Sequence, residues 1–286
     1  MNRKLMARLS AALLFLLLGF LAYTQTQQPQ LKVNKIKDDL FEIEGDGGNV
    51  AVYITPEGVI LVDDKYDQDH DAILEAVKQV TAQPVKYVVS THSHADHSGG
   101  NAKMLGKGVE IISTANARKN IVEKRQTGAP AVTPARLTFT DAQSIFLGGK
   151  ELRARHFGRG HTDGDAIVYF PALRVIHMGD LFTSAPAFVD FNSGGSIVEW
   201  TKTIDGVLNY SWDFDTVIPG HGPVSNKDGL IKYKTTVETT RNKVISMLRE
   251  GKNKDDVTKT LVADFGWNPK GGTILQLDAM LSELKR

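Results

Sequence analysis

The 286-residue chain contains no cysteine. This absence excludes disulfide bonds, thiolate zinc sites, a cysteine nucleophile and a lipidated N-terminal cysteine, so nitrogen and oxygen atoms must hold any metal ion. Net charge is also nearly absent, because 34 basic side chains stand against 33 acidic ones. Nonspecific nucleic-acid binding depends on clustered positive charge, and we therefore expect no nucleic-acid partner.

Long apolar runs are scarce as well. The run AALLFLLLGFLAY at residues 11–23 has 13 residues, whereas a membrane-spanning helix needs about 20. It follows Arg3, Lys4 and Arg8 and precedes the polar TQTQQPQ, which is the order typical of a secretory signal. We predict a signal peptide or uncleaved N-terminal anchor at residues 1–24, a tether at residues 25–32, and export to the periplasm or the medium. Any membrane contact would come through that anchor, and the sequence leaves the oligomeric state open.

Residues 33–286 carry the hydrophobic pattern of one α/β domain. Short apolar runs such as NVAVYITPEG and VILVDD, separated by glycine, proline and aspartate, predict strands. Amphipathic stretches at DAILEAVKQV, 100–105 and 115–125 predict helices, and helices interspersed among strands favour sheets covered by helices. From about residue 226 the pattern becomes helical, over 233–251, 254–266 and 272–286.

Four potential metal ligands directly follow the strand-like segment VKYVVST: His92, His94, Asp96 and His97. In an extended backbone, side chains two residues apart point the same way, so His92 and His94 can converge on one ion. Asp96 and His97 fall where the chain turns into the next helix and can face a second ion. This density of ligands at the end of an apolar strand favours a metal site over a solvated polar loop.

Three more potential ligands share this local context, since His161, Asp180 and His221 each follow a predicted strand and lie beside glycine. Each one alone is weak evidence, because glycine and aspartate are ordinary turn formers. Strand ends at one edge of a sheet assembly lie close together, however, so these distant positions can meet. Together with the first motif they supply seven nitrogen or oxygen ligands, enough for two metal ions with room for water.

The order HSHADH, GHTDGD, MGD and PGHG resembles the metallo-β-lactamase-fold superfamily, including its H-x-H-x-D-H motif, over about residues 40–223. The resemblance implies an αβ/βα four-layer sandwich of two mixed sheets flanked by helices, with a dinuclear site in a groove at one edge. It implies a first metal on His92, His94 and His161, a second on Asp96, His97 and His221, and a bridging Asp180. It also implies that Asp63 contacts one of the metal-binding side chains without binding the metal itself. The alternative is that Asp63 is an ordinary turn residue.

Departures from the superfamily's subclasses bear on the substrate. Class B1 and B2 β-lactamases resemble this chain but have cysteine where Asp180 stands, and the B1 lysine three positions later corresponds to Thr183. Class B3 enzymes lack that cysteine and use serine or threonine nearby, which Thr183 and Ser184 resemble. A bridging aspartate is shared with glyoxalase II, lactonases, arylsulfatase-like members and many exported hydrolases.

These features predict a dinuclear metal hydrolase that uses metal-bound hydroxide on the carbonyl of a small ester, thioester or lactone, with Asp96 as proton shuttle. Two zinc ions suit imidazole and carboxylate ligands best, but iron or manganese also fit. Two alternatives stay open. One is a B3-like β-lactamase, and the other is a sulfur dioxygenase with one iron on His92, His161 and Asp180.

Other conspicuous side chains are given simpler roles. His70 lies in the acidic run DDKYDQDHD, which predicts a solvated residue at the start of a helix. The aromatic residues between Asp180 and His221 either wall a substrate groove or belong to the core; they are Phe182, Phe188, Phe191 and Trp200.

Overall fold

Strands that are apolar at every position form the centre of the fold. The computed structural model describes residues 31–123, 131–268 and 276–285. In β10 (Ile167–Phe170), Val168 and Phe170 face one buried cluster, while Ile167 and Tyr169 face another. Successive side chains of a strand point to opposite faces, so a strand of this kind needs cover on both sides.

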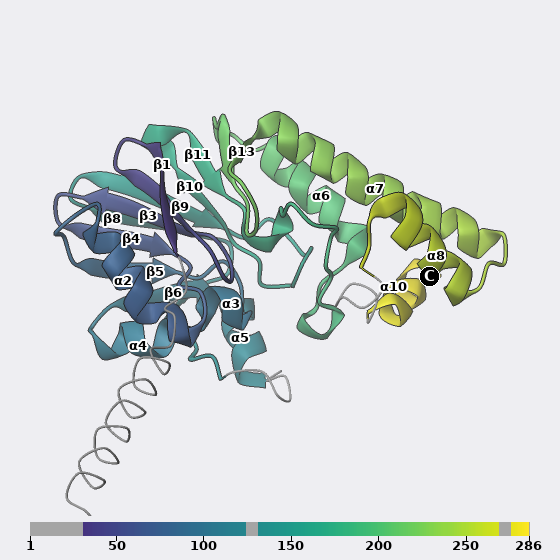
Figure 1. Ribbon diagram of the computed structural model, residues 1–286, viewed down its shortest axis with the longest axis horizontal. Helices are drawn as coiled ribbons and strands as arrows, with labels where there is room; N and C mark the ends of the chain where they lie inside the picture. Colours follow the sequence, from purple (N-terminus) through teal and green to yellow (C-terminus); the bar gives the residue numbers. More distant parts are fainter. Residues whose placement is uncertain (1–30, 124–130, 269–275, 286) are drawn as a thin grey trace, which may run out of the picture. The chain divides into compact units, whose positions relative to one another are not determined.

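The described strands form two sheets (Figure 1). The first has seven strands in chain order, antiparallel from β1 to β4 and parallel from β4 to β7. Its strands are β1 (Lys32–Lys37), β2 (Leu40–Glu44), β3 (Val50–Thr55), β4 (Gly58–Val62), β5 (Val85–Val89), β6 (Glu110–Thr114) and β7 (Leu137–Phe139).

The second sheet has six strands in the order β13-β12-β11-β10-β9-β8, with only β11 and β12 parallel among these described strands. Besides β10 it contains β8 (Ala142–Leu147), β9 (Lys150–Arg155), β11 (Val175–His177), β12 (Thr216–Ile218) and β13 (Ser225–Asn226). Both sheets are therefore mixed, as the family resemblance implies.

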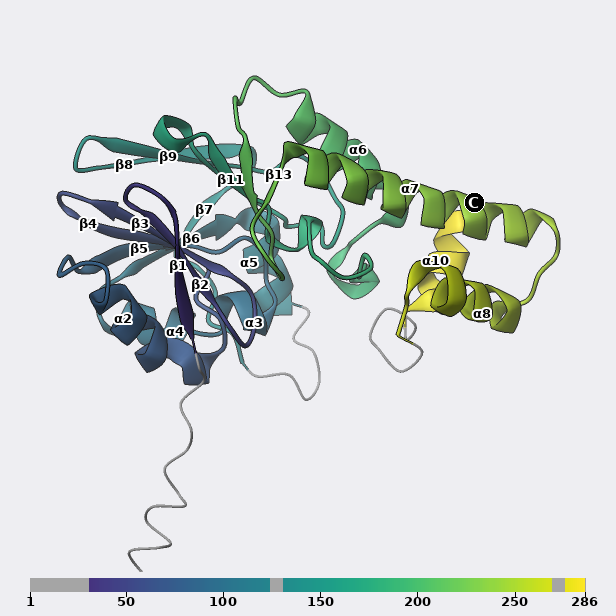
Figure 2. The ribbon, with the colours of Figure 1, turned by 45° about the horizontal axis from the view of Figure 1, so that its top comes forward.

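The two sheets pack face to face between helices (Figure 2). Tyr53 of the first sheet meets Phe170 of the second edge to face, with ring centroids 5.1 Å apart. Helices α2 (His70–Lys78) and α4 (Asn101–Gly106) cover the outer face of the first sheet, and α6 (Ile197–Leu208) and α7 (Lys227–Arg249) cover that of the second. The expected four-layer αβ/βα sandwich is confirmed.

The other α-helices in the described part of the chain are α3 (Ala95–Ser98), α5 (Ala115–Glu123), α8 (Lys254–Phe265) and α10 (Leu277–Leu284). Helices α7, α8 and α10 fall in the three C-terminal stretches for which the sequence indicates helices. The predicted leader, most of the tether, and parts of the helices predicted at 115–125 and 272–286 lie outside the described residues. Among the helices that are described, none has the length and hydropathy needed to cross a membrane.

Two features differ from the sequence analysis. Helix α6 is absent from the predicted elements, although its buried Ile197, Trp200 and Ile204 have helical spacing and Ser196 caps its first turn. The prediction that His70 starts a helix is confirmed, because α2 begins there, but the predicted exposure is wrong, because its side chain is 1% exposed. Helix α4 packs beside the short helix η1 (Asp67–Asp69) that leads into α2, and burial lowers the pKa of His70.

A phenylalanine pair tests the inter-sheet core. Phe170→Ala should lower the free energy of unfolding by about 3–5 kcal/mol, because it opens a cavity between the sheets. Phe146→Ala on β8, where the ring is 71% exposed, should change it by no more than about 0.5 kcal/mol. Urea unfolding of both variants measures the difference, and equal losses would contradict this assignment of the core.

Candidate metal centre

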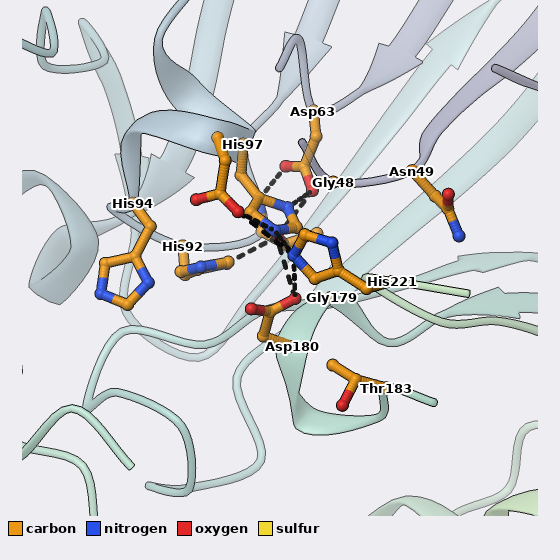
Figure 3. A network of polar contacts seen from close by, with 12 residues as sticks. Gly48, Asn49, Asp63, His92, His94, His97, Gly179, Asp180, Thr183 and His221 are labelled. Carbon is orange, nitrogen blue, oxygen red and sulfur yellow. Dashed lines mark hydrogen bonds and ion pairs between the residues drawn. The ribbon is translucent and has the colours of Figure 1, made fainter. Parts of the chain in front are cut away.

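All seven predicted ligands gather at one edge of the two sheets. Figure 3 shows five of them: His92, His94, His97, Asp180 and His221. His92 and His94 follow β5, and α3 then begins at Ala95, so Asp96 and His97 lie in its first turn. The other three come from the second sheet: His161 from the loop between β9 and β10, Asp180 from the turn after β11, and His221 from the turn after β12.

Asn49, at the start of β3, joins the two sheets beside this edge. Its backbone N–H donates to the carbonyl oxygen of Gly220 at 2.7 Å. Its side-chain amide donates to the carbonyl oxygens of Gly222 at 2.8 Å and Pro219 at 3.1 Å. The turn that carries His221 is thereby held against the first sheet.

The ligands form two groups, each able to hold one metal ion. The ligand atoms within each group lie within 4.8 Å of one another, and the groups are His92, His94, His161 and Asp180, and then Asp96, His97 and His221. In the second group, the Asp96 Oδ2 atom lies 3.1 Å from the His221 Nε2 atom.

Asp180 faces both groups with different oxygen atoms. Its Oδ2 atom lies 3.6 Å from the Nε2 atom of His161 in the first group. Its Oδ1 atom lies 3.1 Å from the Nε2 atom of His97 and 3.4 Å from that of His221 in the second. A carboxylate in this position is suited to bridge two cations.

Two glycines make room for these ligands. A Cβ atom at Gly48 would lie 2.2 Å from the His97 ring, and one at Gly220 would lie 2.0 Å from the Asp180 Oδ1 atom. Any larger side chain at either position would displace a ligand.

Partners behind the histidines fix the orientation of the rings. The Nδ1 atom of His97 lies 2.7 Å from the Asp63 carboxylate, and Asp63 also accepts hydrogen bonds from the backbone N–H and hydroxyl of Thr91. The Nε2 atom of His94 lies 2.9 Å from the carboxylate of Asp190. Partners of this kind set the tautomer of a metal-binding imidazole.

The site's donor atoms fit a cation. The Nδ1 atom of His161 donates to the Phe188 carbonyl oxygen at 2.7 Å, which leaves a lone pair on Nε2 of the neutral ring. When the proton of a neutral His94 ring lies on Nε2, toward Asp190, its Nδ1 atom likewise carries a lone pair. These two nitrogens lie 2.9 Å apart, and the buried Nε2 atom of His92 has no hydrogen-bond partner among the described residues. A cation between the rings would satisfy all three.

The charge balance supports the same conclusion. In the described part of the chain, four carboxylates contact the imidazole rings of the two groups: Asp63, Asp96, Asp180 and Asp190. Burial alone would lower the pKa of His97 and of His221, but these carboxylates raise the first well above its usual value and the second to about 9. Two divalent cations would balance the four negative charges.

A cavity of about 320 Å³ opens over the ligands. Thr183, Phe188 and Tyr66 line it, whereas Ser184 lies on a neighbouring cavity instead. Trp200 and Phe182 are buried in the core, and Phe191 packs partly buried against it. Of the four aromatic residues weighed in the sequence, only Phe188 therefore lines this cavity.

The sequence analysis missed Tyr66 and Asp190. Asp190 is 96 residues from the His94 that it contacts, so no local pattern connects them. Its visible signal is the turn DFNSGG, where its side chain accepts hydrogen bonds from the backbone N–H groups of Asn192 and Ser193.

Comparisons with known proteins agree with this fold. The family model of the Metallo-beta-lactamase superfamily matches residues 43–221. A metallo-beta-lactamase type 2 of Bacillus cereus is 28% identical over 197 residues, which are 67% of this chain and 73% of that protein. Metallo-beta-lactamase IND-1 of Chryseobacterium indologenes is 26% identical over 175 residues, 60% of this chain and 71% of the relative.

Solved structures share the fold. A metallo-beta-lactamase from Pontibacter korlensis superposes with a TM-score of 0.65 and 22% identity, covering 73% of this chain and 99% of its own. The metallo-beta-lactamase DIM-1 superposes with a TM-score of 0.64 and 20% identity, covering 74% of this chain and 98% of the DIM-1 chain. The chain belongs to the metallo-beta-lactamase superfamily. It is a metal-dependent hydrolase.

Replacing Asp190 tests the orientation of His94. In Asp190→Asn the amide keeps an oxygen for Asn192 and Ser193 but offers an N–H group to His94, which forces a proton onto the nitrogen that faces the metal site. We expect metal affinity to fall about 10–100-fold in competition with a chromophoric chelator. The control Asp67→Asn, at an exposed carboxylate paired with Lys103, should leave the affinity unchanged. Equal affinities for both variants would show that Asp190 does not orient the ligand.

Proposed function

We propose that the protein is a dinuclear metal hydrolase that cleaves a small ester, thioester or lactone. The observation that supports this best is the position of Asp180, whose two carboxylate oxygens face different ligand groups. We assign the first metal to His92, His94 and His161, the second to Asp96, His97 and His221, and the bridge to Asp180. Zinc is preferred for these donors, and iron or manganese are compatible with them.

A bound metal pair would supply Lewis acidity, lowering the pKa of water and polarising a carbonyl group. The protein's own side chains would orient the metal-binding histidines and transfer a proton to the leaving group. The Asp96 carboxylate lines the cavity and lies 3.1 Å from His221, so we assign to it the transfer of a proton from the attacking water to the leaving group. Asp63 and Asp190 hold His97 and His94 in the required orientation.

The cavity lining favours an uncharged substrate. Among the described residues that line it there is no lysine or arginine to pair with a substrate carboxylate. Position 183 offers a threonine hydroxyl, which donates to the Ala185 carbonyl oxygen at 3.1 Å. A neutral hydrogen bond contributes less than a charge-assisted one, by about 1 kcal/mol.

β-Lactam hydrolysis is the second candidate, because the curated relatives named above are metallo-beta-lactamases. We further propose that residues 1–24 direct export and that residues 33–286 form the catalytic domain, on the sequence pattern already described.

Metal analysis tests the number of ions. We expect about two transition-metal ions per chain by mass spectrometry, because each ligand group offers at least three donor atoms. His221→Ala should reduce the content to about one ion, since it removes a ligand of the second group alone. One ion or fewer in the unaltered protein, with no further change in His221→Ala, would contradict the metal pair and favour the iron dioxygenase.

Steady-state kinetics test the substrate class. The panel contains nitrocefin, S-lactoylglutathione, a homoserine lactone and p-nitrophenyl acetate, each with metal-loaded protein and with a chelated control. We expect kcat/KM for the best ester, thioester or lactone to exceed that for nitrocefin by about 100-fold or more, a difference near 2.7 kcal/mol. If nitrocefin instead reached about 10⁴–10⁸ M⁻¹s⁻¹ while the others stayed far lower, the protein would be a β-lactamase.

A further inference from the structure

A second cavity, of about 310 Å³, adjoins the metal cavity. Ala185 and Pro186 line both cavities, so the two share a wall at the segment that follows Asp180. The lining of the second cavity is mainly apolar, and it includes Ile197, Val237, Phe265 and Trp267. No ligand residue of either metal group lines it.

The walls of this cavity come largely from the C-terminal helices. Tyr233 and Val237 lie on α7, and Phe265 ends α8. These residues lie beyond residue 221, where the match to the family model ends. Much of the cavity wall therefore comes from a part of the chain that supplies no metal ligand.

Tyr233 lies where this cavity approaches the metal site. Its hydroxyl is buried and has no hydrogen bond of good geometry to any described residue. Burial raises the pKa of Tyr233, an effect that the nearby Thr183 side chain partly offsets, so the phenol keeps its proton. A buried O–H group without a partner is costly and is satisfied when a ligand supplies an acceptor.

We propose that this cavity binds the aliphatic acyl chain of the substrate and that the Tyr233 hydroxyl donates to a polar atom next to that chain. The inference rests on the proposed ester or thioester hydrolysis, since the shared wall would place the reacting carbonyl over the metal ligands. At the ~30 Å³ that a water molecule occupies in the liquid, the cavity holds roughly ten heavy atoms. Because a bound substrate rarely fills a cavity completely, we expect acyl chains of about eight carbons to fit best.

A chain-length series tests the proposal. With p-nitrophenyl esters from acetate to decanoate, each added methylene should raise kcat/KM about 3- to 4-fold, until the cavity is filled near eight carbons. Val237→Phe, which fills the cavity, should flatten this dependence and lower the octanoate-to-acetate ratio at least 10-fold. The matched control Ile231→Trp, at an exposed site on the same helix, should leave the octanoate-to-acetate ratio unchanged. A flat series for the unaltered protein, or an unchanged ratio in Val237→Phe, would overturn the proposal.

A binding measurement separates this inference from the proposed reaction. Octanamide is not an ester, and its binding should shift the tryptophan fluorescence of the unaltered protein through Trp267 but leave that of Trp267→Phe unchanged. Thr236→Trp, at an exposed position on the cavity wall, should weaken octanamide binding about 10-fold even if Val237→Phe does not fold. Octanamide binding without hydrolysis of any ester would support acyl-chain binding in the cavity and contradict the proposed reaction. Ester hydrolysis without octanamide binding would contradict acyl-chain binding in the cavity alone.

Discussion

The arrangement of the site depends on one constraint, which is that several carboxylates and imidazole rings are buried together and need positive charge between them. Asp180 stands at the centre of this constraint, because each of its oxygens faces a different ligand group. Its position in turn requires a glycine at 220, since a Cβ atom there would lie 2.0 Å from Oδ1. Without cations, carboxylates and ring nitrogens would face one another in a largely buried group, so we expect metal binding and the stability of this edge to be linked.

The constraint also explains why the fold is a sandwich of two separate sheets rather than one. Three ligands come from turns of the second sheet and four from the segment after β5 in the first. The ligand groups therefore form only when the two sheets are correctly positioned against each other. Asn49 holds this position through three hydrogen bonds across the edge. The inter-sheet core that contains Tyr53 and Phe170 supplies the burial that keeps these turns together.

The strongest signals in the sequence are local. His92, His94, Asp96 and His97 lie within six residues, and strand patterns precede each of the other candidate ligands, so motif and periodicity indicated α/β layers with these side chains at one sheet edge. The four-layer sandwich and the division of the ligands into two groups were implied by the family resemblance. Asp190 escaped prediction because its contact with His94 spans 96 residues and depends on a loop without regular structure. The error at His70 has the same origin: its acidic neighbours in the sequence indicate solvent, whereas the folded chain buries its side chain.

The segment from Asp180 to Asp190 lies between the candidate metal centre and the apolar cavity. It supplies one ligand, orients His161 through the Phe188 carbonyl and His94 through Asp190, and contributes Ala185 and Pro186 to both cavities. One side of the segment lines the cavity over the ligand groups, whereas Ser184 to Ala187 line the apolar cavity together with α7, Phe265 and Trp267. Substitutions on α7 can therefore reshape the apolar cavity without moving a ligand. A shared metal centre would then serve different substrates in relatives that lack this wall, and likeness in ligands would not by itself identify the substrate.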